Sequence, residues 1–210
     1  MPSADFSHAV RLIYSRLNSA AATDDEVARA QPVFIILSGL PGTGKSTIAR
    51  AVGRALPAIV VESDFVRKSL FPQPDYSAQE SRFTHAVCRA VARQLLKKGY
   101  SVISDATNLK EWHRTLLVRI AEQSSATTLI VQLTAPQPVI RARLRHRFIR
   151  RLPDDHSDAN WTVYELLLAE VQTIKRKHLR IDTSRALDTS VERIVAAARR
   201  VSRPSHRASP

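Results

Sequence analysis

The sequence predicts an α/β fold in which five parallel strands form a sheet with helices on both faces. Short apolar runs of strand length alternate along the chain with longer segments whose apolar residues recur at helical spacing. A glycine-rich turn joins the first of these runs to the helix that follows it. With 210 residues, 44% of them apolar, the chain can bury one substantial core, and we expect one main domain with small additions.

The expected elements follow from this alternation. Strands are expected at 33–37, 58–64, 100–108, 127–135 and 178–184. Helices are expected at 5–20, 43–56, 65–70, 77–98, 109–123, from about 138, 161–177 and 189–201. Two of these helices are expected to open with a capping box, Ser77 with Glu80 and Thr189 with Glu192. Right-handed crossovers would place the carboxyl ends of all strands at one edge, where ligands bind in such sheets.

Composition limits the class of protein. The net charge of +13 and the pI near 10.8 favour acidic partners, namely nucleotides, phosphorylated substrates or nucleic acid. The single cysteine, Cys88, excludes an internal disulfide and fits a reducing cytosol. The first thirty residues contain no compact apolar stretch of the kind a signal peptide needs, and the sequence shows no membrane span. We therefore expect a cytoplasmic protein with no membrane partner; its oligomeric state is left open.

The stretch from Gly39 to Ser46, GLPGTGKS, matches the phosphate-loop pattern G-x-x-x-x-G-K-[ST] between an apolar strand and a helix. Successive N–H groups of such a loop form a nest for anions, and the helix N-terminus adds its positive dipole end. Lys45 is expected to reach the β- and γ-phosphates, and the Ser46 hydroxyl to ligate Mg²⁺. The predicted cofactors are ATP and Mg²⁺, and the predicted nucleotide-binding residues are Gly39, Gly42, Thr43, Gly44, Lys45, Ser46 and Thr47.

Asp64 ends the second expected strand in ESDFVRKSLF. A carboxylate there would face the γ-phosphate and could accept the proton of an attacking hydroxyl. Arg67, one helical turn further on, could bind the substrate or the departing phosphoryl group. An equally supported interpretation is that Asp64, or Ser63, only caps the short helix.

Asp105 ends the third expected strand in VISDATN. We expect it to hold Mg²⁺, directly or through water, and we expect Thr107 and Asn108 to line the substrate side. The alternative is an Asx turn at the end of the strand.

Six arginines lie within eleven residues of the segment IRARLRHRFIRR. Arg143 and Arg147 are four residues apart and so share one face of a helix, where both could offset charge in the transition state. A solvated basic helix and a patch for a nucleic-acid backbone are the alternatives. The histidines show no spacing typical of metal ligands and are interpreted as surface or core residues.

Four motifs in this order, GLPGTGKST, ESDFVRKSLF, GYSVISDATN and RLRHR…SDANW, resemble the small P-loop kinases grouped with zeta toxins, chloramphenicol phosphotransferase and the kinase half of polynucleotide kinases, AAA-type ATP-binding proteins. The resemblance covers about 32–201. It implies that Asp64 is the base, that Arg67 contacts substrate or phosphate, and that Arg114 contacts substrate. It also implies that Arg143 and Arg147 belong to a lid over about 138–160, one near the adenine and one near the γ-phosphate.

The predicted fold is thus a P-loop NTPase-type three-layer sandwich with an arginine-rich helical lid. Its expected segments are a helical extension (1–31), the kinase domain (32–201) and a flexible tail (202–210). The predicted function is ATP-dependent transfer of the γ-phosphoryl group to a hydroxyl of a small-molecule acceptor. Two alternatives stay open: a polynucleotide 5′-hydroxyl kinase, which the basic charge favours, and a nucleotide-gated ATPase that binds nucleic acid.

Overall fold

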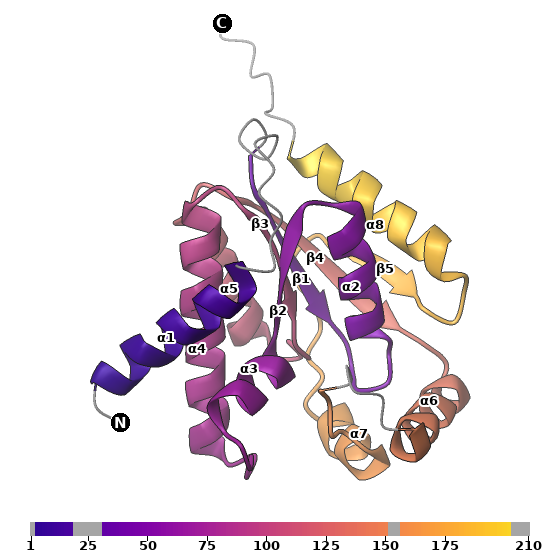
Figure 1. Ribbon diagram of the computed structural model, residues 1–210. Helices are drawn as coiled ribbons and strands as arrows, with labels where there is room; N and C mark the ends of the chain where they lie inside the picture. The colour runs from indigo at the N-terminus through magenta and orange to yellow at the C-terminus, as the bar shows by residue number, and fades with distance from the viewer. Residues whose placement is uncertain (1–2, 19–30, 151–155, 203–210) are drawn as a thin grey trace, which may run out of the picture.

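The computed structural model describes residues 3–18, 31–150 and 156–202. A sheet of five parallel strands, in the order β2-β3-β1-β4-β5, forms its centre (Figure 1). This arrangement confirms the predicted sheet. The strands are β1 (Val33–Ser38), β2 (Ala58–Glu62), β3 (Ser101–Asp105), β4 (Thr127–Thr134) and β5 (Leu179–Asp182).

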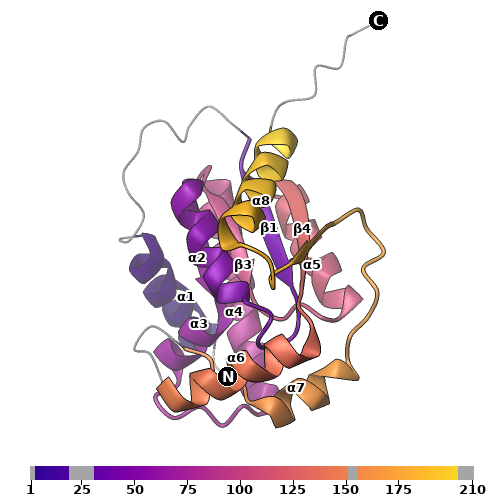
Figure 2. The ribbon, with the colours of Figure 1, turned by 90° about the vertical axis from the view of Figure 1, so that its right-hand side faces the viewer.

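Helices cover both faces of the sheet and complete the predicted three layers. On one face lie α2 (Lys45–Ala55) and α8 (Leu187–Val201), and on the other lie α1 (Ser3–Asn18), α4 (Ala78–Lys97) and α5 (Glu111–Glu122). The short helix α3 (Ser63–Leu70) follows β2 directly. Beyond the carboxyl edge of the sheet, α6 (Gln137–Arg150) and α7 (Trp161–Leu168) lie side by side (Figure 2).

Strand β1 is buried along its whole length because it has a strand on each side and helices on each face. Successive side chains of a strand point to opposite faces. Phe34 and Ile36 therefore pack with α1, α4 and α5, whereas Ile35 and Leu37 pack with α2 and α8. A strand buried on both faces reads as a continuous apolar run, which explains why this strand was predictable from sequence.

The predicted N-terminal amphipathic helix is confirmed as α1. Its residues Val10 and Ile13 are buried in the same core as α4 and α5. Phe6 makes an edge-on ring contact with Phe83 of α4, with 5.9 Å between ring centroids. The described part of the N-terminal extension therefore packs onto the main domain.

Two predicted helix ends are wrong. Helix α7 ends at Leu168 instead of near 177, because tertiary contacts take over the backbone that follows: Gln172 N–H donates to the Leu109 carbonyl at 3.1 Å. Helix α8 begins at Leu187, with Ala186 at the N-cap and no side-chain cap, so Thr189 and Glu192 already lie within its first turns. The predicted capping box at that position does not form.

Of the other predicted capping box, only the hydrogen bond to the Ser77 side chain forms. The Ser77 hydroxyl accepts a hydrogen bond from the Glu80 N–H at 3.2 Å, so α4 starts where the sequence predicts. The Glu80 carboxylate does not return to Ser77, because it accepts from the Asp75 N–H at 2.9 Å and pairs with Arg67. The ion pair with Arg67 and the hydrogen bond from Asp75 thus take the place of the capping-box hydrogen bond to Ser77.

The topology explains where a ligand would bind. The connection after β1 leads through α2 to β2 on one side, whereas the connection after β3 leads through α5 to β4 on the other. Because β1 and β3 are neighbours, a crevice opens beyond their carboxyl ends. The loop after β1 and Asp105 at the end of β3 both lie there.

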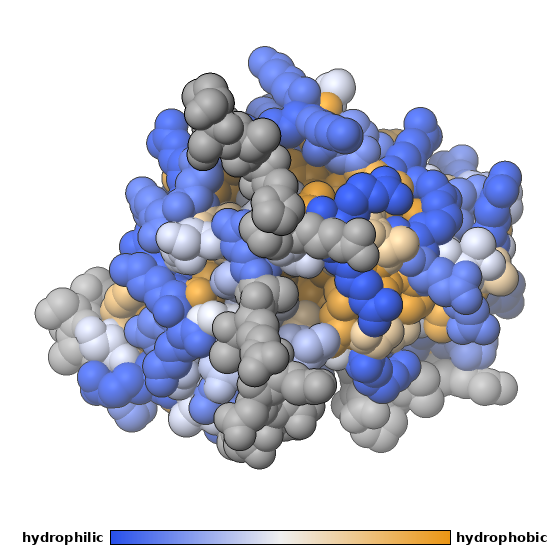
Figure 3. Space-filling model, turned by 90° about the horizontal axis from the view of Figure 1, so that it is seen from above, coloured by the Kyte–Doolittle hydropathy of each residue, from blue (hydrophilic) through white to orange (hydrophobic). Residues whose placement is uncertain are grey.

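Figure 3 shows the surface at the other edge of the sheet, opposite the crevice. There, hydrophilic side chains surround an area of apolar residues (Figure 3). Within the described ranges, no helix is both long and apolar enough to cross a membrane. The predicted tail, apart from Ser202, lies outside the described residues.

Candidate active site

The loop between β1 and α2 has the backbone that its glycines permit. Gly42 and Gly44 have φ angles of 78° and 79°, a region that disfavours side chains. A Cβ on Gly42 would also lie 2.8 Å from the Ile140 side chain of α6. The Gly39 N–H donates to the Thr107 carbonyl at 3.0 Å, which ties the loop to the end of β3. The loop is therefore held in place by a hydrogen bond to the end of β3 and by close packing against α6.

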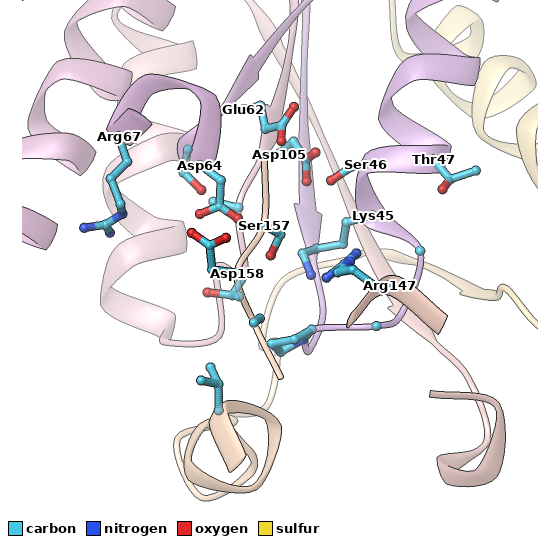
Figure 4. Close-up of a pocket in the computed structure, with 18 of the residues that line it drawn as sticks. Lys45, Ser46, Thr47, Glu62, Asp64, Arg67, Asp105, Arg147, Ser157 and Asp158 are labelled. Carbon is cyan, nitrogen blue, oxygen red and sulfur yellow. The ribbon is translucent and has the colours of Figure 1, made fainter. Parts of the chain in front are cut away.

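Lys45, the first residue of α2, extends back across this loop. Its Nζ donates to the Leu40 carbonyl at 3.0 Å. Burial lowers the pKa of Lys45, and the carboxylates of Asp105 and Asp64 oppose this change, while Arg147 adds to it. Figure 4 shows the lysine between Asp64 and Asp105 on one side and Arg147 on the other. An ammonium group placed in this way is poised to bind an anion.

Asp105 and Ser46 form a pair suited to a divalent cation. Asp105 is only 3% exposed, and burial raises its pKa, although Lys45 and a hydrogen bond with Ser46 oppose the rise. Its Oδ2 atom is buried without a hydrogen-bond partner. Mg²⁺ takes one or two protein oxygens and completes its shell with phosphate oxygens and water. The unpaired oxygen and the adjacent hydroxyl fit such an ion, and no group of three or more His, Cys, Asp or Glu within the described ranges forms a metal site of its own.

Two further carboxylates lie beside Asp105. Glu62, the last residue of β2, stands opposite Asp105 in the strand register, and Asp64 lies in the first turn of α3. Burial, followed by the charge of Asp105, raises the pKa of Glu62, and His156 Nδ1 at 3.3 Å opposes this. Position 62 is the N-cap of α3 and makes no side-chain cap bond, so Asp64 and Ser63 lie inside the helix and do not cap it.

These residues line one cavity of about 880 Å³. Ten of the predicted site residues line this cavity: Gly42, Gly44, Lys45, Ser46, Thr47, Asp64, Arg67, Asp105, Thr107 and Arg147. Five other predicted site residues are not part of the lining: Gly39, Thr43, Asn108, Arg114 and Arg143.

Arg114 has a structural environment instead of the predicted substrate contact. Its side chain is 1% exposed and all of its guanidinium nitrogens donate hydrogen bonds. The acceptors are the Glu111 carboxylate and the carbonyls of Asn108, Leu109, Gln172 and Thr173. Arg114 thus holds the loop after β3 against the segment that follows α7.

Asn108 likewise points inward. It is 2% exposed, its φ angle is 43°, and its Nδ2 donates to the Leu37 carbonyl at 2.7 Å. It joins the ends of β1 and β3, so Thr107 alone of the predicted pair faces the cavity.

The two predicted lid arginines have different surroundings although they share a helix. Arg143 donates to the Thr183 hydroxyl at 2.9 Å, to the Thr183 carbonyl at 2.6 Å and to the Gly42 carbonyl at 3.4 Å. It therefore ties α6 to the phosphate loop and to the end of β5. Arg147, one turn later, lines the cavity beside Lys45 (Figure 4).

Helices α6 and α7 pack as one unit above the loop. Ile140 and Leu144 of α6 are buried against Tyr164 of α7. Trp161 stacks on Tyr164 with 4.6 Å between ring centroids, and the Arg141 guanidinium lies 4.3 Å from the centre of the Trp161 ring. The centre of the predicted lid, 151–155, lies outside the described residues.

Sequence reasoning missed several residues that line the cavity. The segment before α7 contributes Ser157 and Asp158, which lie beneath Asp64 in Figure 4. Asp158 pairs with Lys68 at 3.0 Å and accepts a hydrogen bond from the Tyr76 hydroxyl. Asp158 belongs to the motif SDANW, which marked the segment without assigning it a role. Glu62 likewise stands in a quoted motif, ESDFVRKSLF, without an assigned role, and Tyr76 and His85 are lining residues outside the motifs.

The parallel sheet with this strand order, the phosphate loop between β1 and α2, and the aspartate at the end of β3 define a P-loop NTPase fold. A family model described as "AAA domain" (AAA_33) matches residues 34–174. The chain belongs to this family.

Similar proteins are known from sequence and from structure. L-seryl-tRNA(Sec) kinase of Methanococcus maripaludis is 28% identical over 116 residues, which is 53% of this chain and 44% of that protein. A putative kinase from Chloroflexus aurantiacus is 16% identical with a TM-score of 0.65, covering 83% of this chain and all of the other. APS kinase of Mycobacterium tuberculosis, bound to AMPPNP and APS, is 19% identical with a TM-score of 0.62, covering 79% and 96%. The chain spans less than half the length of the curated relatives that it matches first.

Proposed function

We propose that this chain is an ATP-dependent phosphotransferase that moves the γ-phosphoryl group of ATP to a hydroxyl group of a small-molecule acceptor. One observation carries the proposal: a single cavity has the phosphate loop on one side and the Asp64 carboxylate on the other. Hydrolysis of ATP alone would not need an acceptor space beyond that carboxylate. The kinase names of the archaeal relative and of the structural neighbours support the same reaction type.

The phosphate end binds ATP through the main-chain N–H groups of the loop and through Lys45. Gly39 and Thr43 shape the loop through hydrogen bonds. The Thr43 hydroxyl donates to the Leu40 carbonyl at 2.7 Å, and the Gly39 N–H donates to the Thr107 carbonyl. Ser46 and Asp105 would hold Mg²⁺, which when bound offsets negative charge on the phosphates. Thr47, exposed on α2 at the cavity, is placed for the α-phosphate.

The side of the cavity around Asp64 activates the hydroxyl in this proposal. Asp64 accepts the hydroxyl proton as the acceptor oxygen bonds to the γ-phosphorus and the bond from that phosphorus to the leaving oxygen breaks. Lys45 and Arg147, which face the same space, offset the charge that develops on the transferring group. Arg67 and Thr107 line the acceptor side.

We place the chain, as a finer proposal, near the zeta toxin, chloramphenicol phosphotransferase and polynucleotide kinase group. Support comes from the motifs around Asp64 and Asp105, which the structure brings to one cavity. The cytoplasmic location expected from the lone cysteine stays a prediction.

The Asp64→Asn variant tests the proposal directly. It removes the base and keeps the shape, so we expect ATP affinity within about twofold of the unmodified chain and a loss of transfer of about 10²–10⁴-fold. Transfer is measured with γ-labelled ATP and pooled hydroxyl compounds, and ATP affinity by calorimetry. Asp188→Asn is the matched control, because Asp188 lies in the first turn of α8 and is exposed away from the cavity. Full transfer by Asp64→Asn would exclude the assigned base.

A polynucleotide 5′-hydroxyl kinase is the second candidate, and the net charge of +13 favours it. Transfer of label to a 5′-hydroxyl oligonucleotide that exceeds transfer to every small compound would establish it. ATP turnover stimulated by RNA or DNA without any phosphorylated product would instead indicate a nucleotide-gated ATPase.

A further inference from the structure

The part of the cavity beyond Asp64 has a charge pattern that bears on its substrate. We call this part the acceptor end and define it by the lining residues Asp64, Arg67, Tyr76, His85, Thr107 and Asp158. They come from α3, the connection to α4, α4 itself, the loop after β3 and the segment before α7. Two of the six side chains, Arg67 and His85, can carry a positive charge. The positive charge available to an acceptor depends on whether Arg67 is already paired and whether His85 is protonated.

The positive charge of Arg67 is already matched inside the protein. Its guanidinium is paired with the Glu80 carboxylate, and the two side chains are only 8% and 6% exposed. Its Nη2 atom also donates to the Ser81 hydroxyl at 3.3 Å, and its Cζ atom lies 4.8 Å from the centre of the Tyr76 ring. The Nε atom remains buried without a partner. The charge of Arg67 is thus matched within the protein before any acceptor binds.

His85 adds no positive charge at neutral pH. Burial first, and then the nearby His113, Arg67 and Arg89, lower its pKa to about 3. The His85 and His113 rings meet edge to face, with 4.8 Å between their centroids. A neutral imidazole in the lining is a hydrogen-bonding group for hydroxyl oxygens, and it does not attract anions.

The two carboxylates of the acceptor end, Asp64 and Asp158, have different surroundings. Asp158 has the Lys68 ammonium at 3.0 Å and the Tyr76 hydroxyl as partners. Asp64 itself faces the cavity. Of the six residues that define it, the acceptor end therefore presents the Asp64 carboxylate to an acceptor, whereas the charge of Arg67 is already paired with Glu80.

We infer that the acceptor is a hydroxyl compound without a phosphate, sulfate or carboxylate group, such as a neutral polyol or sugar or an amino alcohol. The inference rests on the proposed function. An anionic acceptor would have to displace Glu80 from Arg67 or lie beside Asp64 uncompensated, and like charges brought together in a confined site are strongly disfavoured. A neutral or amine-bearing acceptor meets neither obstacle.

Matched sets of compounds test this inference. Each set shares one carbon skeleton in three forms, for example glucose, glucosamine and glucose 6-phosphate, or glycerol, serinol and glycerol 3-phosphate. We expect kcat/KM for γ-labelled ATP transfer to be at least about tenfold higher for the neutral or amine form than for the anionic form. Transfer confined to anionic forms would overturn the inference and leave the phosphotransferase proposal intact. ATP binding without transfer to any form contradicts the proposed function, and the inference with it.

The Glu80→Gln variant sharpens the test, because it frees the charge of Arg67 without changing the shape of its partner. We expect the ratio of anionic to neutral acceptor turnover to rise about tenfold. In the double variant Arg67→Gln/Glu80→Gln this ratio should return to the value of the unmodified chain. If Glu80→Gln does not fold, as judged by its thermal transition, Arg67→Gln alone should lower the ratio. An unchanged ratio in the folded variants would show that the ion pair does not set the selectivity.

Discussion

The phosphate end and the acceptor end of the cavity are built in different ways. The phosphate end comes from one short stretch, 39–47, to which β3 adds Asp105 and α6 adds Arg147. The acceptor end comes from five separate segments that meet only in the folded chain. A phosphate group has one fixed chemistry, so a local loop can recognise it, whereas the proposed acceptor would meet a surface assembled from distant residues. The motif therefore predicts the proposed phosphoryl donor much better than the proposed acceptor.

The largest effect should come from breaking the phosphate end at Lys45. Lys45→Met removes the ammonium that we propose to bind the γ-phosphate, and we expect transfer to fall about 10³-fold with weaker ATP binding as well. Labelled transfer and calorimetric titration with ATP measure the two effects. Lys97→Met, an exposed change at the end of α4, is the control. Equal losses for every acceptor would confirm that this end serves the donor.

Substitutions of Arg147 and of Arg143 test whether these two arginines of α6 have different roles. Arg147→Ala should lower kcat at least about 100-fold, because the side chain lines the cavity beside Lys45. Arg143→Ala should lower the melting temperature by about 3–8 °C, because it removes the bonds to Thr183 and Gly42. For both variants, steady-state kinetics measure the change in kcat and thermal unfolding measures the change in melting temperature. The reverse pattern would exchange the two roles.

The smallest effect concerns the acceptor end and pH. The pKa of His85 is about 3 in the folded chain and about 6.5 in an unfolded one, so the unfolded chain binds more protons between these pH values. Stability is therefore fully present above pH 6.5 and falls as the pH drops toward 3, by up to about 1.4 kcal/mol per pH unit for this group. The pKa of His113, about 4, acts in the same direction.

We expect His85→Gln to show a shallower loss of melting temperature between pH 7.5 and pH 5.0 than the unmodified chain. His146→Gln, an exposed change on α6, should leave that loss as it is. An identical pH dependence in all three proteins would mean that His85 is not held neutral by its surroundings.

Much of the fold was predictable because it depends on short sequence separations. The apolar runs gave all five strands, and the turn after β1 gave the loop at which α2 starts. Prediction failed where distant residues compete for the backbone. Arg114 accounts for one such failure: its bonds to the carbonyls of Gln172 and Thr173 stabilise a non-helical path after α7, in a stretch whose spacing predicts helix.

The sequence by itself determined the chemistry of the phosphate end, since a glycine loop followed by Lys45 and Ser46 has few other uses and needs only its neighbours in the chain. It also named Asp64 and Asp105. Only the tertiary structure decided that Arg114 is an internal clamp, that Arg143 and Arg147 differ, and that Glu80 neutralises Arg67. The physical reason is that burial and charge pairing depend on which distant residues contact each other in the folded chain. The spacing of residues along the sequence does not specify those contacts.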